Sequence, residues 1–228
     1  MSKTRAMWKA SYLQLRIYLW CVAGFVAAGL LANIIVSLSV GDNGENAQVS
    51  YANMLGIFLI FVGSVLPVSF FKRIVNLGAT RRDYFKGLLA VYAAWAAGFS
   101  LLNVLWFPIE AHVISDYRLT FNILEIFGWT QFGYAGMFLY QFGVYMLLLS
   151  LFTLLFSGLR HAVGWILWAA LITAIPVGTS VPSLRPHVAD GFLTLLFNDS
   201  LWQGFGLTIL LSAVFLAGSW LFTRRRVF

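Results

Sequence analysis

One basic and aromatic stretch, residues 72–87, carries the side chains of this sequence that are best suited to binding another molecule. It reads Lys-Arg-Ile-Val-Asn-Leu-Gly-Ala-Thr-Arg-Arg-Asp-Tyr-Phe-Lys-Gly and separates two long apolar runs. Arginines alone would suit anionic lipid headgroups, whereas arginines beside a Tyr-Phe pair have the composition of a protein interface. The residues predicted to contact a partner are Gly78, Thr80, Arg81, Arg82, Asp83, Tyr84 and Phe85. The alternative is an ordinary basic loop whose aromatic residues simply begin the next apolar run.

The order of residues within this stretch predicts a firm helical corner. Gly78 can adopt the left-handed conformation that ends a helix. Thr80 and Asp83 have the spacing of a capping box, in which each side chain binds the backbone N–H of the other residue. We therefore expect one helix to end at Gly78 and the next to begin at Thr80, without a flexible loop between them.

A second group of polar residues lies within or at the ends of the apolar runs. It comprises Asn33, Asn53, Asn103 and Gln141. Uncharged amides at membrane depth form hydrogen bonds between helices, at roughly 0.6 kcal/mol each. Alternatively, these four side chains line a path for a substrate. The sequence alone is compatible with both interpretations.

The sequence lacks the motifs that nucleotide binding, metal-dependent hydrolysis and metal coordination require. It contains no Gly-x-x-x-x-Gly-Lys-Ser/Thr loop to bind ATP, no His-Glu-x-x-His motif and no Cys/His cluster with the spacing of a metal site. No Asp, Glu, Lys, Arg or His falls within a predicted span, although proton-coupled carriers usually place such residues at membrane depth. We therefore predict that the chain is not an enzyme and has no catalytic, cofactor-binding or metal-binding residue.

The composition places the chain in a membrane. Of its 228 residues, 61% are hydrophobic and 10% are charged, and runs of roughly 20 apolar residues are long enough to cross a bilayer. We predict an all-α polytopic membrane protein with a single transmembrane domain over residues 1–228. Its six predicted spans cover residues 18–40, 51–71, 88–108, 132–157, 162–181 and 201–222. The formal charge of +7 is therefore interpreted as topology, and no nucleic-acid partner is predicted.

The distribution of basic residues predicts the orientation of these spans. If both termini are cytoplasmic, all of the 15 lysines and arginines except Arg118 and Arg185 fall on the cytoplasmic side. Lysine and arginine are enriched in cytoplasmic loops, and this bias sets orientation. The acidic residues other than Asp83 fall outside, which agrees with this orientation but carries less weight.

Two segments outside the spans are predicted to lie at the membrane surface. Residues 2–17 place Arg5, Lys9 and Arg16 on one side of a helix beside an apolar stripe, which predicts an interfacial helix on the cytoplasmic face or a plain basic tail. Residues 191–197 are apolar but too short to span. An outer interfacial or re-entrant helix is therefore expected before the last span.

Residues 76–87 carry a resemblance to a known family. They read Asn-Leu-Gly-Ala-Thr-Arg-Arg-Asp-Tyr-Phe-Lys-Gly, which resembles the Leu-Gly-x-Ser/Thr-Arg-Arg/Lys-x-Tyr/Phe-Phe stretch between the second and third spans of small bacterial ABC-2-type transporter permeases. The six spans, the cytoplasmic termini, the basic lead-in helix and the apolar segment before the last span are also similar to that family. The likeness covers the whole topology, but at motif level it covers only this stretch.

This resemblance implies a permease subunit in the plasma membrane of a bacterium, without an ATPase of its own. Two such subunits, identical or paralogous, would pair with two separately made ABC ATPase subunits, which would bind ATP and Mg²⁺. The corner would then be the coupling helix that docks on the ATPase, and membrane lipid would surround the spans. The family exports lipids, glycans, peptides, antibiotics and other amphiphiles.

Two other functions fit the same sequence. The chain could be a non-transporting membrane protein, such as an immunity, sensor or scaffold subunit that binds a cytoplasmic partner through the corner. It could also be an uncoupled carrier or flippase. Co-purification with an ATPase would separate the permease from both alternatives.

Overall fold

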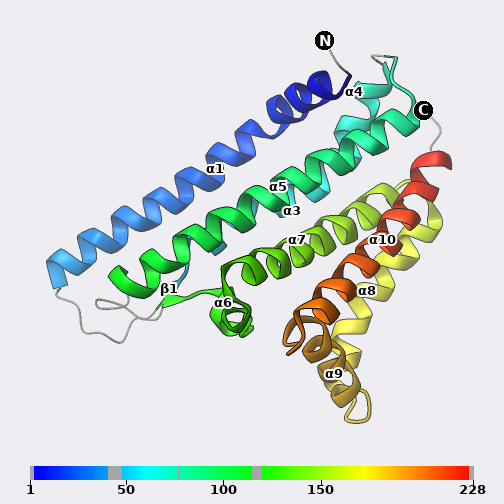
Figure 1. The fold of residues 1–228 in the computed structure, drawn as a ribbon. Coiled ribbons are helices and arrows are strands. Elements are labelled where there is room, and N and C mark those ends of the chain that lie inside the picture. Colours follow the sequence, from blue (N-terminus) through cyan, green and yellow to red (C-terminus); the bar gives the residue numbers. More distant parts are fainter. Residues whose placement is uncertain (1–2, 41–47, 77, 115–119, 226–228) are drawn as a thin grey trace.

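Six long apolar helical stretches make up most of the protein (Figure 1). The computed structural model describes residues 3–40, 48–76, 78–114 and 120–225. The stretches long and apolar enough to cross a membrane are Met7–Asn33, Tyr51–Asn76, Arg81–His112, Trp129–Gly158, Ala162–Ser180 and Leu201–Arg225. The prediction of an all-α protein with six membrane-length helices is therefore confirmed, and the architecture is that of a multi-pass membrane protein.

The first helix, α1 (Lys3–Val40), is longer than predicted. Residues 2–17 were expected to form an interfacial helix or a plain basic tail, whereas residues 3–17 belong to the same helix as the first span. The reason is local, because the sequence from Lys3 to Ala23 contains neither glycine nor proline to interrupt a helix. Met7, Ser11 and Leu15 form its buried face, whereas Leu13 and Ile17, placed on the predicted apolar stripe, are exposed.

The second span is built from four consecutive helical segments. They are α2 (Tyr51–Gly56), α3 (Phe58–Val65), the π-helix η1 (Leu66–Phe70) and α4 (Phe71–Asn76). Pro67 lies near the start of η1. Proline has no backbone N–H and its ring crowds the preceding turn, so the helical hydrogen-bond pattern is disturbed there.

The third span, α5 (Arg81–Ile109), does not end at Pro108 as predicted. It continues directly into a π-helix, η2 (Glu110–Ile114). After it, the short strand β2 (Thr120–Phe121) pairs in parallel with β1 (Gln48–Val49), with Gln48 opposite Thr120. The short helices α6 (Ile123–Ile126) and η3 (Trp129–Phe132) then lead into the fourth span.

The fourth span, α7 (Gly133–Gly158), is the central helix of the bundle, because it packs against α3, α5 and the last helix, α10 (Leu201–Arg225). Gly143 of α7 lies against Thr208 and Phe205 of α10. Gly204 of α10 lies against Tyr140 of α7. Small residues on both helices thus let the two helices approach closely over their length.

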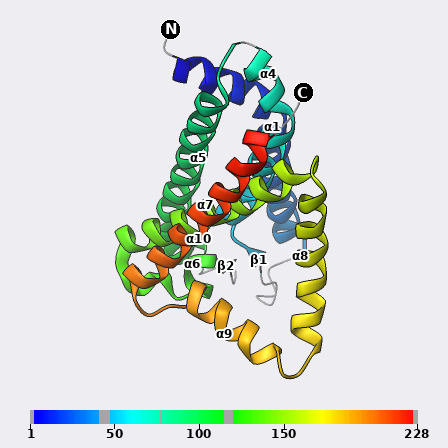
Figure 2. The same cartoon turned by 90° about the vertical axis from the view of Figure 1, so that its right-hand side faces the viewer.

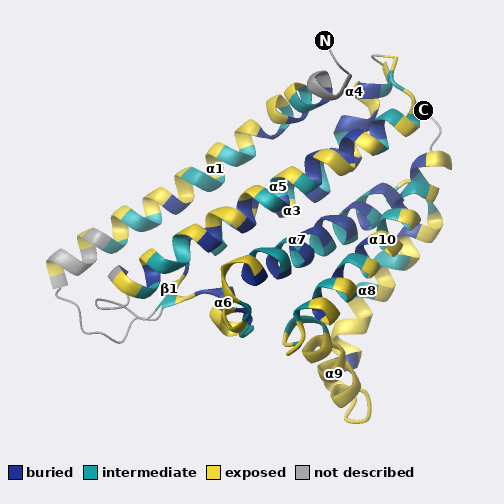
Figure 3. Ribbon diagram, in the orientation of Figure 1, coloured by how far each residue is buried: buried dark blue, intermediate teal, exposed yellow. Residues whose placement is uncertain are grey.

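Helices α8 (Ala162–Ser180) and α9 (Arg185–Leu196) form the least buried part of the bundle. No residue of α9 is buried, and most of α8 is exposed (Figure 3). Helix α9 joins the far ends of α8 and α10 (Figure 2). The apolar segment predicted before the last span therefore does form a helix, and residues 191–196 are its second half.

The first turn of α1, the turn between α4 and α5, and the last turn of α10 lie at the same end of the bundle (Figure 1). The elements that meet there carry basic residues, including Lys72, Arg73, Arg81, Arg82 and Arg224. The elements that frame the predicted binding stretch are therefore α4, α5 and α10.

Candidate functional site

The turn between α4 and α5, which we call the corner (residues 78–85), has the backbone geometry that its sequence predicts. Gly78 has a φ angle of +83°, the left-handed region that favours glycine. Its N–H donates to the carbonyl oxygen of Val75 at 2.9 Å, and the N–H of Ala79 donates to that of Ile74 at 3.3 Å. This pair of bonds is a Schellman ending for α4. Leu77 lies outside the described residues.

The predicted capping box of α5 is also confirmed. The backbone N–H of Asp83 donates to Oγ1 of Thr80 at 3.1 Å, and the backbone N–H of Thr80 donates to Oδ2 of Asp83 at 3.4 Å. The residues that end α4 and begin α5, Gly78 to Thr80, are therefore only three. The corner is held by its own hydrogen bonds, so it presents its side chains in a fixed arrangement.

Replacement of Thr80 by alanine should lower the free energy of unfolding by about 1 kcal/mol, because the side-chain acceptor of the cap is lost. Thermal unfolding of the purified protein in one detergent measures this change. Thr80→Ser, which keeps the hydroxyl, should restore most of the loss. Thr179→Ala is a suitable control, because Thr179 is exposed and bonds only within α8. Equal stabilities of Thr80→Ala and Thr179→Ala would contradict this role of the cap.

Tyr84, which was predicted to contact a partner, is buried and does not lie on the surface of the corner. Its side chain is 2% exposed, and its ring packs against those of Phe70 and Phe71 at centroid distances of 6.3 and 5.0 Å. Its hydroxyl donates to the carbonyl oxygen of Leu66 at 3.3 Å. The expectation of an exposed Tyr-Phe pair is therefore wrong for tyrosine. Tyr84 instead packs the start of α5 against η1 and the first residue of α4, at the end of the second span.

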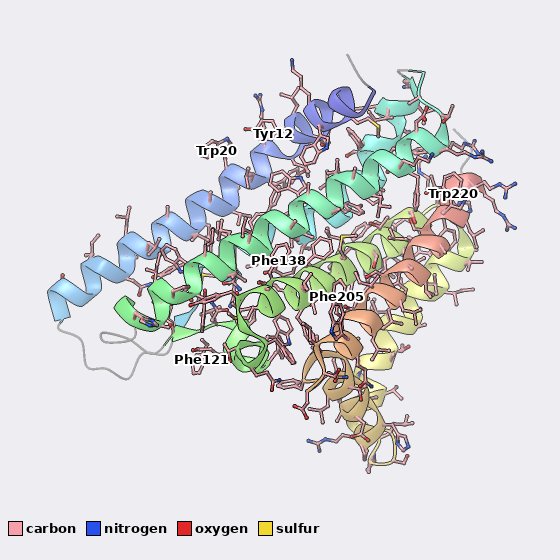
Figure 4. All side chains as sticks on the ribbon, in the orientation of Figure 1. Tyr12, Trp20, Phe121, Phe138, Phe205 and Trp220 are labelled. Carbon is pink, nitrogen blue, oxygen red and sulfur yellow. The ribbon has the colours of Figure 1, made fainter. Side chains whose placement is uncertain are left out.

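The residues that the corner does present are Arg81, Arg82 and Phe85. Arg82 is exposed, and Arg81 and Phe85 are half-buried. The ring of Phe85 lies against that of Trp220 in α10, at a centroid distance of 5.1 Å. Figure 4 shows Trp220 at this end of α10, beside side chains that end in nitrogen. The corner surface thus combines cations with aromatic rings, and Trp220 reaches it from a helix that is distant in the sequence.

Arg224 is the second residue of α10 that sequence reasoning missed. Its backbone carbonyl oxygen accepts a hydrogen bond from Nη1 of Arg81. It also lines, with Thr80, Arg81, Arg82 and Trp220, a basic pocket of about 540 Å³. In the sequence, Arg224 is distinguished only as part of the basic run that follows the last span, and such runs follow many membrane helices.

A buried polar network lies at the opposite end of α5. Asn103 donates to Oδ1 of Asn53 at 3.0 Å and to Oδ1 of Asn122 at 3.2 Å. Asn122 donates in turn to Glu110 at 2.8 Å, and Nε1 of Trp106 donates to the same carboxylate at 2.7 Å. Glu110 is 2% exposed within the network. Its partners satisfy the carboxylate, which allows burial.

The four amides proposed to line a substrate path all form hydrogen bonds inside the bundle. Asn53 and Asn103 belong to the network, Asn33 donates to the hydroxyl of Tyr51 at 3.1 Å, and Gln141 donates to the hydroxyl of Tyr145 at 2.7 Å. The basic pocket at the corner, an apolar groove beside Phe85 and Trp220, and an apolar cavity beside Leu101 and Tyr134 are all lined by other residues. The arrangement therefore favours interhelical hydrogen bonding over the lining of a path.

The residues suited to hold a metal are scattered in the part of the chain that the structure describes. Within it, no group of three or more His, Cys, Asp or Glu side chains is close enough to bind an ion. Comparison of the chain with models of protein families, with curated proteins and with solved structures finds no match.

Proposed function

We propose that this chain is the permease subunit of an ATP-driven ABC transporter of the ABC-2 type, and that the corner docks on a separate ATPase subunit. The ATPase would bind ATP and Mg²⁺, and a second permease subunit, identical or paralogous, would complete the pathway. An amphiphile such as a lipid, peptide or antibiotic is the proposed export substrate. The protein would lie in the bacterial plasma membrane with both termini cytoplasmic.

The observation that carries this proposal is the way in which the corner is fixed to two spans at once. The Schellman ending and the capping box hold its backbone. The contacts of Tyr84 with Leu66, Phe70 and Phe71 join the first turn of α5 to the end of the second span. A push on the corner would therefore move α4 and α5 together, as a coupling element must, whereas a flexible loop would absorb the displacement.

The charge of this end of the bundle supports its placement in the cytoplasm. The corner, the last turn of α10 and the start of α1 lie together at this end (Figure 1), and each of them carries basic residues. Basic residues next to spans face the cytoplasm, where an ATPase is found. Arg226 and the outer acidic residues of 41–47 and 115–119 lie outside the described residues.

Purification of the tagged chain from membranes of its native host, in a mild detergent, tests the proposal. An ABC ATPase should co-purify in roughly equal amount, and the complex should hydrolyse ATP. An unrelated six-span protein with the same tag is the control. Recovery of the folded chain without any ATPase, in several detergents, would contradict the permease function and would favour a scaffold or an uncoupled carrier.

A further inference from the structure

A groove between α5 and α10 opens beside the corner. Its walls are apolar and are formed by Phe85 and Leu89 of α5 and by Ala213, Leu216 and Ala217 of α10. Trp220 closes the end nearest the corner. The groove encloses about 450 Å³. Small side chains on α10 create this space, because alanine at positions 213 and 217 leaves the facing surface of α5 uncovered.

The groove continues into the basic pocket at the corner. Arg82 and Trp220 line both, so the apolar groove and the pocket of about 540 Å³ form one continuous concave surface. Arg81 and Arg224 supply the other charges of the pocket, and Lys86 lies at the mouth of the groove. The surface is therefore cationic at the end of the helices and apolar along them.

We propose that this surface binds one anionic phospholipid of the surrounding bilayer. The phosphate would lie in the basic pocket and an acyl chain would lie along the groove. Arginine pairs with phosphate through two parallel hydrogen bonds, and basic pockets between membrane helices hold anionic headgroups. Trp220 stands where charge gives way to apolar surface, the depth that tryptophan prefers in bilayers.

Charge complementarity and depth select a lipid over a protein segment as the occupant. The groove walls offer almost no side-chain partner for the backbone groups of a peptide, which would be costly to leave unpaired at membrane depth. An acyl chain has no such groups. The site lies on this chain alone, so its occupation requires neither the ATPase nor transport.

Native mass spectrometry of the purified, delipidated full chain tests the proposal. The probes are phosphatidylglycerol and phosphatidylcholine with identical acyl chains. One phosphatidylglycerol should bind per chain, at least tenfold more tightly than phosphatidylcholine, because several arginines face its phosphate without a choline to oppose them. Arg224→Gln should weaken binding of phosphatidylglycerol on the order of fivefold.

Matched variants in α10 separate this site from a general effect of charge or bulk. Arg225→Gln removes the neighbouring exposed charge, which does not line the pocket, and should leave the affinity unchanged. Ala217→Phe fills the groove and should abolish the tight site, whereas Val214→Phe places the same bulk outside the groove on the same helix.

Three results would overturn the proposal. They are equal affinities for the two lipids, unchanged binding in Ala217→Phe, and equal losses in Arg224→Gln and Arg225→Gln. A dimer of the delipidated wild type that Ala217→Phe dissociates, together with absent lipid selectivity, would identify the groove as a contact between subunits instead.

Discussion

Replacement of Asn122 by alanine should destabilise the protein by about 3 kcal/mol, because a buried polar network loses one of its members. Asn122 is buried and its amide donates to Glu110, Asn103 and Ser50. Its Oδ1 also accepts the backbone N–H of Leu124 at 3.1 Å and so caps α6. Alanine would leave a buried carboxylate with one side-chain partner fewer, which costs about 1–3 kcal/mol or more, in addition to the lost cap.

Asn198→Ala is the matched control for this prediction. Asn198 also accepts a backbone N–H two residues ahead, that of Ser200 at 2.8 Å, and donates one bond to Thr194, but it belongs to no buried network. Its loss should be about 1 kcal/mol. Thermal or denaturant unfolding in one detergent measures both variants. Similar losses for Asn122→Ala and Asn198→Ala would contradict the structural role of the network.

A double variant would test the coupling between the carboxylate and the amide. Glu110→Gln removes the charge that Asn122 supports, so the loss caused by Asn122→Ala should be smaller in that background than in the wild type. Residues that share one buried network show coupling energies of about 0.5–3 kcal/mol. Strictly additive losses would mean that the two side chains act independently.

The corner was predictable from the sequence because its signals are local. A glycine with φ of +83° and a Thr-x-x-Asp cap depend only on residues within one or two turns. The number of membrane-length helices was predictable for a similar reason, because length and apolarity are properties of each segment. The continuation of the third helix past Pro108 was not predictable, because the burial of Glu110 depends on Asn122, a residue of a later segment.

The site errors have a common physical cause, which is contact between residues far apart in the chain. Tyr84 is buried because Phe70 and Phe71, on the other side of the turn, pack against its ring. The residues next to Tyr84 in the sequence do not reveal these contacts. Trp220 and Arg224 reach the corner from the last helix. Sequence patterns indicate which residues are suited to binding, whereas tertiary packing decides which of those residues remain at the surface.

Reversal of the charge of Arg82 should have the largest functional effect. Arg82 is exposed on the first turn of α5 and lines both the groove and the basic pocket. Glutamate is favourable near a helix N-terminus, so Arg82→Glu should fold as the wild type does. If Arg82 is an interface hot spot worth about 2 kcal/mol, its loss should weaken ATPase binding about thirtyfold. The hydrolysis of ATP should then no longer respond to the permease.

The direct measurement of this central claim is the affinity of the ATPase, once identified by co-purification, for the purified wild type and its variants. Lys9→Glu is the control, because Lys9 is exposed on α1 and undergoes the same change of charge. Ala217→Phe, which fills the groove along the helices and changes no residue of the basic pocket, separates the proposed lipid site from docking and should bind the ATPase normally. The account predicts strong binding to all except Arg82→Glu. Equal affinities of Arg82→Glu, Lys9→Glu and the wild type would contradict docking through the corner.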